Sequence, residues 1–153
     1  MLVIGAGVLT ARSTIGEPVR VSSGSMAPTV CTGDVVLIDR FDADRGVRVD
    51  DIVTFPSPVD GAEQIKRVVG VGGQRVAIAD AVLLVDGREV AEPYVDRSTI
   101  DGVYFGPVTV PEGSVFVMGD SRELSIDSRT FGAVPVEDLD GRLRTTLWSA
   151  CAG

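Results

Sequence analysis

The sequence predicts a single, mostly β domain with little helix. Its 153 residues are long enough to bury one core and too short for several domains. The chain is rich in valine and contains 18 Gly and 8 Pro, a composition that favours strands joined by turns. No stretch shows a sustained helical period, and neither an internal repeat nor a linker divides the chain.

The predicted strands are short and bounded by turn residues. Alternating apolar and polar residues predict the first, and apolar runs predict most of the others. One strand contains Lys66 and ends at Gly72-Gly73, and Asp86-Gly87 is a strong signal for a hairpin. The expected strands are 19–21, 35–39, 52–55, 64–71, 76–85, 88–90, 115–118 and 143–148, with a polar loop over 121–130.

The chain begins with an apolar segment that Arg12 ends. A membrane-spanning helix needs about 20 apolar residues, so this run is too short to span. No basic stretch precedes it, which makes it a poor secretory signal. We therefore divide the chain into a short apolar segment, residues 1–16, that is a possible remnant of a membrane anchor, and a folded domain, residues 17–153.

Charge and cysteine content narrow the possible partners. The formal net charge is -8, which disfavours binding to nucleic acid or to an anionic membrane by charge attraction. Cys31 and Cys151 show no metal-binding spacing. Outside the cytoplasm they could form a disulfide, but sequence alone does not show that their positions meet.

The chain has no histidine and a single lysine, Lys66. A histidine base and a histidine metal site are therefore excluded, and a serine nucleophile would need another base. A lysine on a buried apolar strand can lose its proton near neutral pH. Chance loss of the other lysines, or an edge strand whose lysine reaches water, would explain Lys66 without any chemistry.

Three segments stand out in the sequence, and one of them carries this lysine. Residues 23–29 form a small-residue loop in which Gly24 allows a tight turn beside a serine. Such a turn can aim backbone N–H groups at a developing oxyanion. Residues 64–69 place Lys66 among Ile and Val, and residues 119–132 are dense in short polar side chains and alternating charges.

Together these segments resemble the type I signal (leader) peptidases, membrane-bound serine proteases that remove signal peptides. The resemblance covers about residues 17–141 and implies coiled antiparallel sheets. It implies that Ser25 is the nucleophile and Lys66 the general base of a Ser-Lys dyad. The same match implies Ser23 in the oxyanion hole, Ser125 orienting the lysine amine, Asp120 with Arg67 and Asp127 with Arg129 as supporting ion pairs, and Val21, Met26, Val30 and Ile65 lining substrate pockets.

The resemblance implies a serine endopeptidase that cleaves signal peptides from exported preproteins after small residues, without cofactor or metal. Its partners would be those signal peptides and, at its N-terminus, the membrane; it would be a monomer with no nucleic-acid partner. The domain would face the extracytoplasmic side of the cytoplasmic membrane. We expect the native protein to begin upstream and to carry one spanning helix.

Some residues depart from the family pattern, and other functions remain open. Ser121 replaces the usual Asn, Asp50-Asp51 replaces Gly-Asp, and residues 72–74 replace Pro-Gly-Asp. A specialised maturation peptidase acting on a pilin or conjugation protein, or an inactive β binding module, would share the fold. A self-cleaving repressor is excluded, because the stretch before Ser25 has no room for a DNA-binding domain.

Overall fold

The computed structural model describes residues 16–41, 43–98 and 103–151, so nearly all of the expected apolar segment, residues 1–16, lies outside the described residues. The described chain is mostly strand with little helix, as the sequence predicts. In chain order the elements are β1 (Glu17–Arg20), β2 (Val35–Asp39), β3 (Ile52–Pro56), β4 (Glu63–Val71), β5 (Arg75–Ala79), β6 (Val82–Val85), β7 (Arg88–Glu89), β8 (Phe105–Thr109), β9 (Ser114–Met118), α1 (Ser128–Phe131), β10 (Val134–Pro135), a 3-10 turn (Val136–Asp138) and β11 (Gly141–Trp148).

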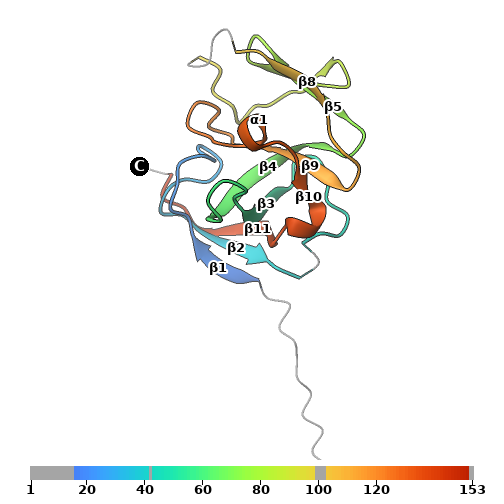
Figure 1. Cartoon of the computed structure of the whole chain (residues 1–153). Helices are drawn as coiled ribbons and strands as arrows, with labels where there is room; N and C mark the ends of the chain where they lie inside the picture. The colour runs from blue at the N-terminus through green and yellow to red at the C-terminus, as the bar shows by residue number, and fades with distance from the viewer. Residues whose placement is uncertain (1–15, 42, 99–102, 152–153) are drawn as a thin grey trace, which may run out of the picture.

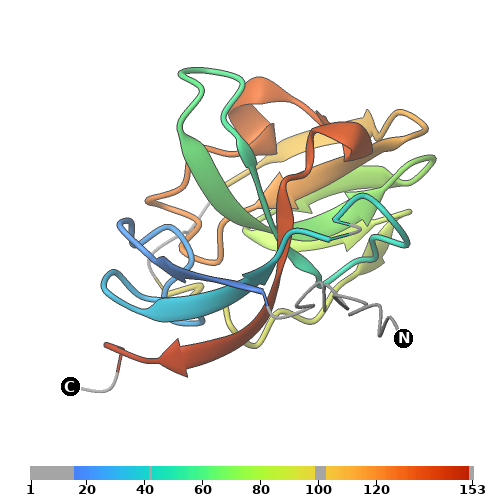
Figure 2. The same ribbon diagram turned by 90° about the horizontal axis from the view of Figure 1, so that it is seen from below.

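The described strands form two antiparallel sheets. The larger has the order β1-β2-β11-β3-β4-β9-β10 and the smaller has the order β7-β6-β5-β8. Figure 1 shows the smaller sheet above the larger one, with β4 and β9 in the upper part of the larger sheet. Figure 2 shows the long, curved β11 beside β2, where two register shifts interrupt the pairing. The chain passes from β4 of one sheet to β5 of the other through the predicted turn at Gly72-Gly73.

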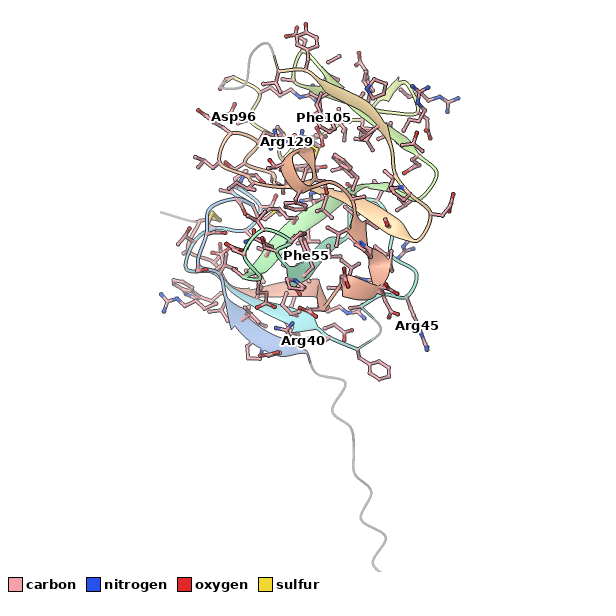
Figure 3. The ribbon with its side chains drawn as sticks, viewed as in Figure 1. Arg40, Arg45, Phe55, Asp96, Phe105 and Arg129 are labelled. Atoms are coloured by element: carbon pink, nitrogen blue, oxygen red, sulfur yellow. A yellow bond between two sulfur atoms is a disulfide. The ribbon has the colours of Figure 1, made fainter. Side chains whose placement is uncertain are left out.

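Three apolar clusters hold these layers together. One surrounds Phe55 of β3, whose ring meets that of Phe131 edge to face at 6.1 Å. A second joins the two sheets, because Val76 of the smaller sheet packs with Phe116 of the larger. Figure 3 shows Phe55 within the larger sheet and Phe105 beside the smaller one. The third lies under the loop after β1 and contains Val21, Met26, Val30, Val36, Ile38 and Ile52.

The structure corrects the sequence-based elements in three places. Residues 76–85 are not one strand, because Asp80 and Ala81 adopt positive φ values of 50° and 64° and turn the chain between β5 and β6. The hairpin at Asp86-Gly87 therefore joins β6 to β7. Strands β8 and β10 were not expected, and α1 begins within the expected polar loop and ends one residue after it.

Cys31 and Cys151 form a disulfide with a sequence separation of 120. It ties the C-terminal end of the chain to the loop after β1, and Figure 1 shows these two segments side by side. The buried carboxylate of Asp34 accepts hydrogen bonds from the backbone N–H groups of Cys31 and Ala150 at 2.9 and 2.5 Å. These backbone hydrogen bonds lower the pKa of Asp34, with the one from Cys31 contributing most.

Within the described ranges, no helix is long and apolar enough to cross a membrane.

Candidate active site

Ser25 and Lys66 meet between the loop after β1 and strand β4. The Lys66 Nζ lies 2.9 Å from the Ser25 Oγ, although the two residues are 41 positions apart. Lys66 is 1% exposed and Ser25 is 7% exposed. Strand β4 places the amine there because it is an interior strand, paired with β3 on one side and with β9 on the other.

Burial decides the charge of the Lys66 amine. Loss of water around the ammonium lowers the pKa of Lys66 from 10.5 to about 8, while the negative charge of Asp127 acts in the opposite direction. A shift of this size corresponds to about 3 kcal/mol against the charged form. A substantial fraction of the amine is therefore neutral near physiological pH, as a general base requires.

The Lys66 amine has two further partners on its own strand. Its Nζ lies 3.1 Å from the Gln64 Oε1 and 3.1 Å from the Ile65 backbone oxygen. The sequence analysis did not select Gln64. Its position two residues before Lys66, and hence on the same face of the strand, was the available signal. Ser125, which was expected to orient the amine, has a buried Oγ without a hydrogen-bond partner among the described residues.

The segment that follows β9 packs closely against the backbone of Ser25. The Ser23 Oγ lies 3.4 Å from the Ser25 Oγ. The backbone N–H of Ser121 donates a hydrogen bond to the Ser25 carbonyl at 3.0 Å. A Cβ at Gly119 would lie 2.5 Å from the same carbonyl oxygen and 2.3 Å from the Ser125 Oγ. Only glycine at position 119 therefore allows the closing segment to approach the serine loop this closely.

A buried ion pair joins β4 to the segment after β9. The Arg67 guanidinium donates to both carboxylate oxygens of Asp120, at 2.9 and 2.7 Å. Thr29 donates to the same carboxylate from the serine loop, at 2.5 Å. The ring of Tyr94 stacks under the Arg67 guanidinium, with 3.9 Å from the Cζ to the ring centroid. Four segments of the chain thus meet around one paired charge.

A second ion pair stabilises the turn of α1. Asp127 accepts from the Arg129 Nε at 2.8 Å and caps α1 through the backbone N–H of Arg129. The same carboxylate accepts from the Gly119 N–H at 3.1 Å. Asp127 is fully buried, and it is the charge that acts on Lys66.

Sequence reasoning also missed a third buried pair. Glu92, in the segment after β7, pairs with Arg122, whose Nη1 lies 2.9 Å from the Glu92 Oε2. The Arg122 Nε donates to the Gly119 carbonyl at 3.0 Å. Glu92 is 4% exposed. A lone Glu beside a Pro carries no sequence signal of this contact, because its partner lies 30 residues away.

A groove of about 310 Å³ opens beside this site, between β1 and the start of β4. Val21 and Ile65, two of the four predicted pocket residues, line it. Met26 and Val30 are not among its lining residues, and both are buried in the core cluster under the serine loop. The other lining residues are Val19, Arg20, Ser22, Ser23, Val36, Ile38, Thr54, Ala62, Glu63 and Gln64.

No group of three or more His, Cys, Asp or Glu residues that could hold a metal ion occurs in the described part of the chain. The site instead contains a hydroxyl, an amine and an amide in contact with one another. Three carboxylate–guanidinium pairs accompany them. A hydroxyl that contacts a partly neutral amine can act as a nucleophile in acyl transfer.

Comparison with known proteins places nearly the whole chain in one family. The family described as "Signal peptidase, peptidase S26" matches residues 1–148. Signal peptidase I of Bacillus caldolyticus is 32% identical over 154 residues, which cover 92% of this chain and 84% of that protein. Signal peptidase I of Mycobacterium tuberculosis H37Rv is 32% identical over 192 residues, and there the match covers 88% of this chain and 65% of the relative.

A solved structure has a similar fold. The crystal structure of a signal peptidase I from Enterococcus faecalis V583 matches with a TM-score of 0.58 and 33% identity. The match covers 65% of this chain and 98% of that one. The antiparallel arrangement described above is therefore also found in an experimentally determined relative.

Proposed function

Because the chain belongs to the signal peptidase (peptidase S26) family of serine endopeptidases, we propose that it removes signal peptides from exported preproteins with Ser25 and Lys66 as its catalytic dyad. The observation that carries the dyad is the 2.9 Å contact between the Ser25 Oγ and the Lys66 Nζ, made by a lysine that is 1% exposed. The fold places the Lys66 amine beside the Ser25 hydroxyl, and the burial of Lys66 favours the neutral form of that amine.

The reaction proceeds through an acyl-enzyme. The neutral Lys66 amine takes the proton of Ser25, and the Oγ attacks the scissile carbonyl carbon. The backbone N–H of Ser25 and the Ser23 hydroxyl stabilise the resulting oxyanion. The Lys66 ammonium then gives its proton to the leaving amine as the peptide bond breaks. A water, deprotonated by the same amine, hydrolyses the ester and regenerates the Ser25 hydroxyl.

The groove beside the dyad suits an extended substrate with small side chains. Val21 and Ile65 lie along its wall. A substrate strand held there presents alternate side chains to the wall, as in other peptide complexes that extend a sheet. We expect cleavage after small residues, with Ala favoured one and three positions before the cut.

The wall of the groove provides a test of this specificity. Ile65→Ala should relax the requirement for small residues, since it removes apolar volume where the substrate side chain would lie. A library of peptides that vary at these two positions measures the effect. An unchanged preference would remove Ile65 from the specificity pocket.

We place the catalytic domain on the extracytoplasmic side of the cytoplasmic membrane, with the N-terminal segment at the membrane and the domain acting as a monomer. The Cys31–Cys151 disulfide supports this location, since such bonds persist in oxidising surroundings and are rare in the cytosol. Fractionation of cells that express the native gene tests it, and recovery of the protein entirely from the soluble cytoplasm would contradict it.

Two substitutions test the dyad directly. Ser25→Ala and Lys66→Arg should both abolish turnover, because the first removes the nucleophile and the second replaces the base with a group that stays charged. Arg88→Lys, at an exposed position of β7, is the control and should keep the wild-type rate. Cleavage of a preprotein by either dyad variant at a rate near that of the wild type would refute the mechanism.

A further inference from the structure

We propose that Gln64 is a positioning residue whose side-chain carbonyl holds the Lys66 amine with its lone pair aimed at the Ser25 hydroxyl. The proposal rests on the proposed dyad and adds a group to it. It arises from one contact, the 3.1 Å distance between the Gln64 Oε1 and the Lys66 Nζ.

The argument begins with the number of protons on the amine. A neutral lysine amine has two N–H donors and one lone pair, whereas the ammonium has three donors and no lone pair. Three oxygens surround the Lys66 Nζ: Ser25 Oγ at 2.9 Å, Gln64 Oε1 at 3.1 Å and the Ile65 carbonyl at 3.1 Å. The amide and backbone carbonyl oxygens can only accept, while the hydroxyl can also donate.

This inventory fixes the orientation of the neutral amine. If its two protons go to the two oxygens that can only accept, its lone pair is left for the Ser25 hydroxyl, which must then donate. The serine proton is thereby placed on the line along which it will be transferred. Without the Gln64 carbonyl, one amine proton is free to turn toward the Ser25 Oγ, and the hydroxyl then has no base in front of it.

Gln64 supplies one of the two acceptors that contact the amine. The Ser125 Oγ, expected to orient the amine, is buried without a hydrogen-bond partner in the described part of the chain. The Ile65 carbonyl supplies only one of the two acceptors that the amine needs. Gln64 lies on the same face of β4 as Lys66, and it is held in register opposite Phe55 of β3.

Gln64 also lines the groove beside the dyad. It is half-buried, whereas Lys66 is almost fully buried. The side chain can therefore be exchanged with less disturbance of the core than a change at Lys66 would cause. Asp127 is the charged group that acts on the amine in the present site.

The test compares kcat and KM of the full chain across pH for two variants. Gln64→Leu keeps the size of the side chain and removes the acceptor, so kcat should fall by about 10- to 100-fold at every pH with KM little changed. Gln64→Glu keeps an acceptor and adds a negative charge, which favours the ammonium. Its activity should fall by about 10-fold at neutral pH and recover as the pH rises and Lys66 loses its proton.

A matched control is available on the same stretch of chain. Gln74 is also half-buried and its amide oxygen also accepts a hydrogen bond, from the backbone N–H of Val71. It lies in the turn after β4, outside the groove, so Gln74→Leu should leave kcat and its pH dependence unchanged. Thermal unfolding of each variant establishes that the compared proteins are folded.

The two variants distinguish a positioning role of Gln64 from a purely structural role. Recovery of Gln64→Glu at high pH, with Gln64→Leu remaining slow, supports the proposal, since a purely structural role would not follow the protonation of Lys66. A wild-type kcat and pH profile in Gln64→Leu, or no recovery in Gln64→Glu, would overturn it. If Gln64→Leu does not fold, Gln64→Met, which also lacks the carbonyl acceptor, takes its place.

Failure of this proposal is distinguishable from failure of the proposed dyad. Turnover in Ser25→Ala or Lys66→Ala would refute the dyad whatever Gln64 does. Inactive dyad variants together with a normal Gln64→Leu would refute the positioning role alone.

Discussion

At the residue scale, burial of the Lys66 amine favours its catalytic form and lowers the stability of the domain. Lys66 has a pKa of about 8 because burial removes water from the ammonium. The folded state therefore disfavours the charged form that predominates at neutral pH. The penalty of about 3 kcal/mol is a large part of the 5–15 kcal/mol by which an ordinary domain is stable.

Replacing Lys66 with Met should stabilise the domain while it abolishes activity. We expect a gain of up to about 3 kcal/mol near neutral pH, because the variant no longer has to bury an ammonium. The native pKa of about 8 lies below the unfolded value of 10.5, so the unfolded chain binds more protons between them. The penalty on the wild type is therefore fully present below pH 8 and is relieved as the pH rises toward 10.5.

Urea unfolding of both proteins across this pH range measures the gain. It should shrink toward the alkaline end, while an exposed exchange such as Arg88→Met should show no such trend. A gain that does not depend on pH would mean that the amine is not the group responsible.

The same pKa predicts how the rate depends on pH. Only the neutral amine can accept the Ser25 proton, so kcat/KM should rise with pH through a midpoint of about 8. Steady-state cleavage of a peptide substrate from weakly acidic to alkaline pH measures the midpoint. A rate that is already maximal in weak acid would contradict a lysine base.

At the scale of elements, the strand that carries the base was predictable and the contacts behind it were not. The apolar run around Lys66, ended by Gly72-Gly73, has a local signal, and β4 matches it closely. Strand β8 lacks such a signal because Gly106 and Pro107 interrupt its apolar residues, and it is fixed only by pairing with β5. The turn at Asp80-Ala81 was missed because it contains no glycine or proline, and Ala81 rarely adopts the positive φ that it has here.

The residues of the candidate site also divide into those with a signal in the sequence and those without one. Lys66 drew attention as the single lysine, and Ser25 and Lys66 were selected as a pair because their segments resemble the signal peptidase motifs. Gln64 and Glu92 were not, because an isolated Gln or Glu has many harmless uses and its partner is visible only in three dimensions. Met26 and Val30 were predicted to line the groove, but the tight turn of the serine loop directs their side chains into the core.

The pair between Glu92 and Arg122 should matter for the connection between the two sheets. Glu92→Gln removes one charge and leaves the Arg122 guanidinium buried, so we expect a loss of about 3–5 kcal/mol. The control is Glu17→Gln in the exposed pair with Arg40, which should lose less than about 1 kcal/mol. Denaturant unfolding measures both. Equal losses in the two variants would show that burial does not strengthen the inner pair.

At the scale of the whole molecule, the disulfide constrains the unfolded chain. Reduction of a native disulfide typically costs about 2–5 kcal/mol, and a loop as long as the one between Cys31 and Cys151 favours the upper part of this range. Thermal unfolding with and without a thiol reductant should show the difference. A Cys31→Ser/Cys151→Ser double variant should be as unstable as the reduced protein and should not respond to the reductant.

The disulfide also changes what one cut in the backbone can do. Residues 31 to 151 form a covalently closed ring that contains β2 to β11 and Lys66, while β1 and Ser25 precede the ring on the same chain. A protease that nicks the exposed turn at Val59, between β3 and β4, would open the ring without releasing a fragment. The nicked protein should run as one species on a non-reducing gel and as two after reduction. The nicked protein would in this way keep Ser25 and Lys66 in one covalently linked molecule.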